Sequence, residues 1–507
     1  MLSSVPAGDC CLDPFKDLPS GLLHNIGSRQ AANGKATTEE QAVSDGPTSD
    51  PLIRINYGSG LTPTEELLTQ LGERSFLRFW SHANPYVNRK EELCDLLVVC
   101  GDFVITFSDK NNEYRSTDDQ LTGWRRWYKS AATKSVNQLN GATRNLLLHR
   151  VPIFKDKECT VPLGIPIPHS GRERHYRVAV VSRARSLNQR EAFVPFIKID
   201  SSVVGVAHTQ DGAVPFVVGD VAPKQQFVHV MDVAGLRAVL TELDTVSDFA
   251  EYLDARESFI RGNPGNSADS EWSLLARFML SYDDEGESLP MDRQAPGATQ
   301  LTRAEWDNDQ FRRDMANRRE ANAVSRVWDM LIEDQATMIE KQSFAFSTFR
   351  SVEGAERVVQ YMALEHRLHR RILGKRWMEA CQLDRPESPA NLRTVPHSAK
   401  GWTTYVFLNV SNFLNESQEQ YREKRRWLLR DMMLASLVDE PNSQIIIGIA
   451  AELGGPPDSY DLAFFDVVEN EGEQLRKDAR LAWEKKRQAF ELPVRTRHDE
   501  WSIPRPK

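Results

Sequence analysis

Two apolar runs rich in strand-forming residues follow each other in residues 92–110, ELCDLLVVCGDFVITFSDK, with Gly101 and Asp102 between them. A Gly-Asp pair readily forms a tight turn, so the segment predicts a buried β-hairpin. The faces of such apolar strands must be buried against other elements. The hairpin therefore points to a sheet that helices flank.

The flanking sequence predicts those helices and further strands. Residues 61–80, LTPTEELLTQLGERSFLRFW, place apolar residues near one face of a helix. A second helix is expected within 121–150, and YRVAVVSRA (176–184) reads as another buried strand. The order is helix, strand, strand, helix, strand. Three more strand candidates (VPFIKI, VPFVVG and QFVHVMD) and two helices at 233–243 and 245–260 complete this half.

Changes in composition divide the 507 residues into several parts, which predicts a multidomain α/β protein. We expect a mixed sheet flanked by helices, then a helical middle region, then a small C-terminal α/β domain. The predicted boundaries are a disordered tail over 1–50, an α/β domain with an extension over 51–262, a linker over 263–305, a helical region over 306–384, a linker over 385–400 and the small α/β domain over 401–507.

Charge and motifs exclude several classes of function. The chain holds 63 Lys and Arg against 72 Asp and Glu, so any nucleic-acid site must be a local basic patch. It contains no P-loop and no GxGxxG motif, and its six cysteines lack zinc-site spacing. With no apolar run of membrane-spanning length and no signal-peptide pattern, we expect a cytoplasmic protein without membrane contact.

The two ends of the hairpin carry its chemical groups. Asp95 opens the first strand, and Ser108, Asp109 and Lys110 close the second. Since side chains alternate along a strand, Ser108 and Lys110 share a face that can meet Asp95, while Asp109 points the other way. A carboxylate, a second oxygen group and an ammonium at one place can hold a divalent metal and contact a phosphate.

This arrangement over about residues 72–184 resembles the restriction-endonuclease-like PD-(D/E)XK nucleases, in particular their divergent NERD-like branch. In that family a glutamate-bearing helix precedes a hairpin with Asp and (Asp/Glu)-x-Lys, and a helix with Gln and a further strand follow. The resemblance implies catalytic roles for Asp95, Asp109, Lys110 and Gln138, and a Mg²⁺ or Mn²⁺ site at Glu73, Asp95 and Asp109.

The chain departs from the family pattern at Ser108, where the second acidic ligand is expected. A hydroxyl is a poor Mg²⁺ ligand. A working site would need Asp109 to turn inward through a bulge, or Glu73 or Glu92 to replace the missing acid.

A basic strip follows the hairpin. Residues 121–150 contain six basic residues and no acidic one, and the candidates for nucleic-acid contact are Arg125, Arg126, Lys129, Lys134 and Arg144. Trp124, Trp127 and Tyr128 lie among them. They could stack on unpaired bases or form the buried stripe of an amphipathic helix.

Two further charged segments have structural explanations. Asp244, Thr245 and Asp248 suit the capped start of a helix, and HRLHRR (366–371) is predicted to be surface charge.

Three functions remain open. The first, implied by the resemblance, is a metal-dependent nuclease that hydrolyses DNA, as in host defence or DNA processing. The second is an inactive nuclease-fold module that binds nucleic acid or a protein partner, with Ser108 as the mark of lost activity. The third is an assembly protein whose helical middle or C-terminal domain binds a protein partner.

Overall fold

The computed structural model describes residues 63–110, 112–148, 150–184, 193–281, 298–340, 352–381, 390–396, 402–412, 416–453, 460–467 and 473–489. The described residues form a mixed α/β protein with several sheets, which confirms the predicted fold class. The expected tail over 1–50 lies outside them. None of the described helices combines the length and apolarity needed to cross a membrane.

A five-stranded mixed sheet forms the centre of the first half, in the order β1-β4-β5-β6-β9. Its strands are β1 (Ser81–Ala83), β4 (Leu96–Cys100), β5 (Phe103–Lys110), β6 (Arg174–Val181) and β9 (His229–Asp232). β1, β4 and β5 are antiparallel, whereas β6 and β9 continue the sheet in parallel with β5. Gly101 turns the chain between β4 and β5 with a φ of 60°, so the predicted hairpin is confirmed.

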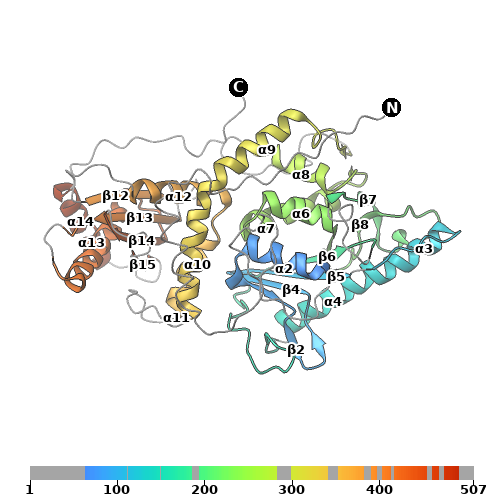
Figure 1. Cartoon of the computed structure of the whole chain (residues 1–507), viewed down its shortest axis with the longest axis horizontal. Helices are drawn as coiled ribbons and strands as arrows, with labels where there is room; N and C mark the ends of the chain where they lie inside the picture. The colour runs from blue at the N-terminus through green and yellow to red at the C-terminus, as the bar shows by residue number, and fades with distance from the viewer. Residues whose placement is uncertain are drawn as a thin grey trace, which may run out of the picture.

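Helices cover both faces of this sheet (Figure 1). One face packs against α2 (Pro63–Phe76), α6 (Val233–Glu242) and α7 (Val246–Gly262). The other face packs against one long helical segment made of α3 (Gln120–Tyr128), the π-helical turn η2 (Lys129–Thr133), α4 (Lys134–Thr143) and the π-helical turn η3 (Arg144–Leu148). The Asp119 carboxylate caps α3 by accepting the Leu121 N–H at 3.0 Å.

Two smaller sets of strands adjoin the main sheet. A short ribbon of β2 (Tyr86–Asn88) and β3 (Glu91–Glu92) precedes β4, and a 3-10 turn, η1 (Arg78–Trp80), follows α2. A second sheet, in the order β11-β10-β7-β8, contains β7 (Lys198–Val204), β8 (Val217–Asp220), β10 (Ser267–Ala268) and β11 (Gln300–Leu301), with the 3-10 turn η4 (Gly205–His208) after β7. The expected linker at 263–305 thus contributes two strands and α8 (Glu271–Met279), because its apolar residues are buried.

The middle region is helical, as predicted, and lies between the two halves of the protein (Figure 1). It comprises α9 (Asp309–Asn322), the 3-10 turn η5 (Ala323–Ser325), α10 (Arg326–Glu340), α11 (Val352–Ala363) and α12 (Arg367–Cys381). Its apolar residues join one continuous core with both flanking sheets. Trp328 packs edge-on against Tyr405 of the C-terminal sheet at a centroid distance of 5.2 Å. The middle helices therefore bind the two halves together.

The prediction of surface charge for residues 366–371 is wrong. Arg367 and Arg370 are each only 1% exposed. Arg367 Nε donates to Asp244 at 2.7 Å, and both arginines donate to Asp329 at 2.7 Å. Opposite charges from α10 and from the loop between α6 and α7 compensate the buried guanidinium groups, and this is why a basic run can lie in the interior.

The C-terminal part contains a four-stranded sheet in the order β12-β13-β14-β15. Its strands are β12 (Ala390–Pro396), β13 (Thr403–Val410), β14 (Ile445–Glu452) and β15 (Tyr460–Asp466), and its helices are α13 (Gln418–Asp439) and α14 (Glu473–Ala489). β12 lies where the sequence predicts a linker at 385–400. It pairs with β13 along its whole length as an edge strand, a position in which its proline is tolerated.

Candidate active site

The β4–β5 hairpin brings Asp95 and Lys110 together. The register pairs Leu96 with Phe107, so Asp95 at the start of β4 lies near the end of β5. Lys110 Nζ is 3.6 Å from Asp95 Oδ2. The Asp95 side chain is 6% exposed and that of Lys110 is 27% exposed, so the pair lies at the edge of the core with the ammonium partly open to solvent.

Ser108 lies beside this pair and is held by Gln138. Its hydroxyl donates to Gln138 Oε1 at 2.8 Å, and the serine is fully buried. Gln138 belongs to α4, which packs on the face of the sheet that also carries Val104. The structure therefore brings together Ser108 and Gln138, thirty residues apart in the sequence, on the face that the hairpin alternation predicts.

Asp109 occupies the opposite face of β5. The preceding residues of that face, Ile105 and Phe107, pack into the core under α2. The register between β5 and β6 runs without a shift to Lys110, so there is no bulge to turn Asp109 toward Lys110. The Asp109 N–H donates to Asp95 Oδ2, but its own carboxylate oxygens are buried and have no hydrogen-bond partner among the described residues. The proposed inward turn of Asp109 is therefore wrong.

Burial sets the protonation state of Asp109. Loss of solvent, with smaller contributions from the negative charges of Asp95 and Glu65, raises its pKa to about 8. The carboxyl group is consequently protonated at neutral pH. Its place on the face of β5 away from Ser108 and Lys110 does not suit the role of metal ligand.

Glu92 is the acid that best accompanies Asp95. It lies in β3, and desolvation together with the charge of Asp95 raises its pKa to about 7. Burial also raises the pKa of Asp95, while Lys110 and the Asp109 N–H act in the opposite direction. Two neighbouring carboxyl groups with raised pKa values form a site that a cation would stabilise.

The helix glutamate near this cluster is Glu65, which the sequence analysis missed. The charge of Glu65 raises the pKa of Asp95, Asp109 and Glu92. Glu73 lies two helical turns further along α2, where its neighbours are Arg78 and Glu333 of α10. The helical period alone could have pointed to Glu65, because Glu65 and Glu73 lie two turns apart on α2. Only the tertiary packing shows which of the two is near Asp95.

These residues fit a metal only in a restricted way. Mg²⁺ is often held by one or two carboxylates and completes its shell with water, and Asp95 and Glu92 could supply that number. The described residues do not bring three ligand atoms together at this place. The one group of three that they contain is Asp248, Glu251 and His366.

That group of three has a structural explanation. Asp248 Oδ1 is 2.9 Å from His366 Nδ1, and Asp248 Oδ2 accepts hydrogen bonds from Thr245 Oγ1 and the Arg367 N–H. Thr245 caps α7 as predicted. Asp248 therefore joins the start of α7 to the start of α12.

The basic strip on the long helix is partly open to solvent. Arg126, Lys129, Lys134 and Arg144 are exposed. Arg125 differs, because its Nη2 lies 2.7 Å from Asp211 Oδ1 and its Nε donates to the Thr209 carbonyl.

The aromatic residues within the strip are buried. Trp124 is 0%, Trp127 3% and Tyr128 7% exposed. They pack against the sheet, so base stacking on them is excluded and the buried-stripe alternative is confirmed.

Comparison with known proteins adds no relative to this description. No family model, no curated protein and no solved structure matches the chain.

Proposed function

We propose that the first half of the protein is a metal-dependent nuclease of the restriction-endonuclease-like class that hydrolyses phosphodiester bonds in DNA. The observation that carries the proposal is the 3.6 Å contact between Lys110 Nζ and Asp95 Oδ2 at the hairpin end, with the Glu92 carboxyl beside it. An ammonium and two carboxyl groups at one partly open edge are the groups that phosphodiester hydrolysis requires.

The topology supports the same class. The order α2, β1, β4, β5, long helix, β6 follows the helix, hairpin, helix and strand order of the family that the sequence resembles. β6 pairs in parallel with β5, and the intervening helix supplies Gln138. The class thus accounts for both the order of elements and the groups that converge on β5.

Each side chain has a distinct role in this proposal. Asp95 and Glu92 would hold Mg²⁺ or Mn²⁺, which when bound would offset phosphate charge and activate water. Lys110 orients the water and balances the negative charge that develops on the phosphate.

The remaining groups position the site and the substrate. Gln138 fixes Ser108 and thereby the end of β5 against α4. The exposed basic residues Arg126, Lys129, Lys134 and Arg144 lie along the same helical segment and would contact the DNA backbone.

A second candidate is a nuclease-fold module that binds nucleic acid without cutting it. The observation that favours it is the buried Ser108 hydroxyl, which is engaged by Gln138 where a second acid would be expected. In that case the basic strip would carry the function alone.

The two candidates separate in one set of assays. We would incubate the full chain with plasmid, linear duplex and single-stranded DNA in the presence of Mg²⁺, Mn²⁺ or EDTA. Variants Lys110→Ala and Asp95→Asn test the site, and Lys157→Ala, at an exposed position, is the matched control. Metal-dependent cleavage that falls at least about 100-fold in both site variants, but not in the control, supports the nuclease.

Other outcomes reassign or overturn the proposal. Salt-sensitive binding without cleavage, lost in Arg126→Glu/Lys129→Glu, supports the second candidate. Cleavage that persists in Lys110→Ala contradicts the assigned site. If the protein neither cleaves nor binds DNA, a role in protein assembly remains.

A further inference from the structure

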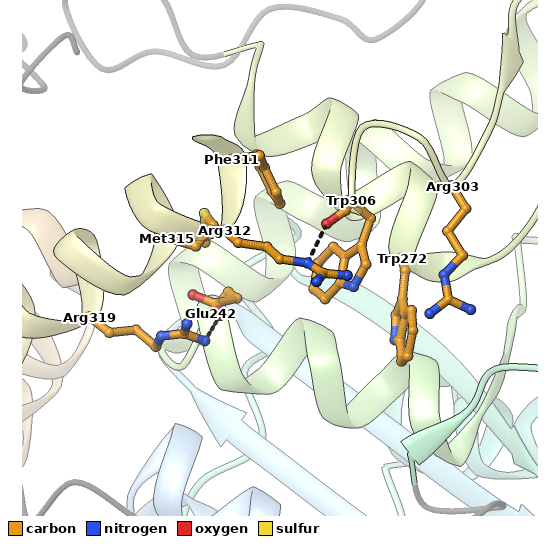
Figure 2. A pocket seen from close by; sticks show the side chains of 8 residues that line it. All are labelled: Glu242, Trp272, Arg303, Trp306, Phe311, Arg312, Met315 and Arg319. Atoms are coloured by element: carbon orange, nitrogen blue, oxygen red, sulfur yellow. Dashed lines mark hydrogen bonds and ion pairs between the residues drawn. The ribbon is translucent and has the colours of Figure 1, made fainter. Parts of the chain in front are cut away.

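A cavity of about 270 Å³ lies apart from the candidate active site, between α8 and the start of α9 (Figure 2). Trp272, Trp306 and Phe311 give it apolar walls, and Arg303, Arg312 and Arg319 contribute guanidinium groups. Neither the proposed nuclease site nor the basic strip uses any of these residues. The cavity is therefore separate from the residues of the proposed function.

The aromatic walls offer flat surfaces. The rings of Trp272 and Trp306 stack with centroids 5.3 Å apart and an interplanar angle of 22°. Phe311 lies at 5.9 Å from Trp306 with a tilted ring. Trp272 is covered by Trp306 and by the Arg303 guanidinium, so the half-buried Trp306 offers the ring surface that remains for a planar group. Such surfaces bind planar aromatic groups by stacking.

The charged side chains that line the cavity are mostly basic. Arg303 Nε lies 3.0 Å and Arg312 Nη2 2.6 Å from the same carboxylate, that of Asp307. One negative charge thus serves two guanidinium groups. Arg319 is balanced by Glu242 at 2.8 Å, an ion pair that Figure 2 shows at the other end of the cavity. Three of the eight lining residues are thus basic and one, Glu242, is acidic, so guanidinium groups make up most of the charged lining.

Two of these guanidinium groups lie close to the tryptophans. Arg303 lies over the Trp272 ring at 4.5 Å, and Arg312 Nε donates to the Trp306 carbonyl at 3.4 Å. Both are exposed. The Trp272 Nε1–H is buried and has no hydrogen-bond partner within the described part of the chain. A stacking surface and cationic groups thus occur together.

We propose that this cavity binds one unpaired nucleotide, with its base against Trp306 and its phosphate at Arg303 and Arg312. The guanidinium groups of the lining disfavour a cationic ligand, and a bare phosphate leaves the aromatic walls unused. The volume lies just below the roughly 300–1,000 Å³ of ordinary small-molecule pockets, so it suits a single nucleotide. The nucleotide is either free or part of a single strand.

Calorimetric titration of the full-length protein tests the proposal. The probes are AMP, adenosine, ribose 5-phosphate, a short oligo(dT) strand and a duplex of equal length. We expect AMP to bind at least about tenfold more tightly than adenosine or ribose 5-phosphate, since each of those lacks one of the two contacts. If oligo(dT) binds more tightly than AMP, the ligand of the cavity is a nucleotide within a single strand. If AMP binds more tightly, the ligand is a free nucleotide.

Variants connect any binding to the cavity. Arg312→Ala removes an exposed guanidinium and should weaken binding at least about tenfold, while Arg313→Ala changes the next residue of the same helix, which lies outside the cavity. Unchanged thermal unfolding of both variants ensures that the comparison concerns binding. No binding of AMP or oligo(dT), or binding that Arg312→Ala leaves intact, overturns the proposal.

Discussion

Replacement of Asp109 by asparagine should stabilise the protein increasingly as the pH rises. Asp109 is 3% exposed, and in the part of the chain that the structure describes its carboxylate oxygens have no hydrogen-bond partner. Burial raises its pKa from 3.8 to about 8. The folded protein therefore retains a proton that the unfolded chain releases. This group's contribution to stability is complete below pH 3.8 and is lost progressively as the pH rises toward 8.

The size of the effect follows from that interval. At about 1.4 kcal/mol for each pKa unit, the interval corresponds to an upper limit of about 6 kcal/mol. Relaxation of the surroundings and water entry reduce such penalties, so we expect the free energy of unfolding of Asp109→Asn to gain about 3 kcal/mol on the wild type between pH 4 and 8. The amide that replaces the carboxyl group has no partner among the described residues either. Its burial therefore lowers the free energy of unfolding by the same amount at every pH.

Urea denaturation followed by tryptophan fluorescence at a series of pH values measures this difference. Asp118→Asn is the control, because that position is exposed and should change stability by no more than about 0.5 kcal/mol. Parallel curves for the wild type and Asp109→Asn would refute the reasoning. If the nuclease proposal is correct, Asp109→Asn should also retain metal-dependent cleavage, because its carboxyl group lies on the face of β5 away from Ser108 and Lys110.

Three further substitutions test the buried polar groups. Asp329→Ala should cost about 3–5 kcal/mol in thermal unfolding, because it leaves buried guanidinium groups without their carboxylate. His366→Asn should lower the melting temperature at pH 6 more than at pH 10, because Asp248 raises the His366 pKa to about 9 and the stabilisation is lost as the pH rises through that value. Gln138→Leu should cost about 1–3 kcal/mol by stranding the buried Ser108 hydroxyl, and adding Ser108→Ala should recover part of that loss.

Each of these substitutions has a matched control at an exposed position. Glu320→Ala accompanies Asp329→Ala, His169→Asn accompanies His366→Asn, and Asn137→Ala accompanies Gln138→Leu. A loss for Asp329→Ala no greater than that of its control would contradict the ion network. A pH-independent effect of His366→Asn would contradict the pairing with Asp248. A double variant as unstable as Gln138→Leu alone would contradict the Ser108 hydrogen bond.

The sequence determined the local elements of this protein. Period-two and helical patterns, with the turn at Gly101, predict the β4–β5 hairpin and the helices around it. Thr245 was among the predicted caps of α7, and strand alternation places Ser108 and Asp109 on opposite faces of β5. These features depend on contacts between residues close in the chain, which a sequence displays directly.

Only the tertiary structure decided which charged groups are buried and which of them meet. It placed Glu65 rather than Glu73 of α2 beside Asp95, and it buried Arg367 against Asp244, a residue 123 positions away. It also made part of the predicted linker over 385–400 into the edge strand β12. An arginine on a helix looks the same in sequence whether water or a distant carboxylate compensates its charge, and the folded chain settles that choice because desolvation is tolerated only where a partner arrives.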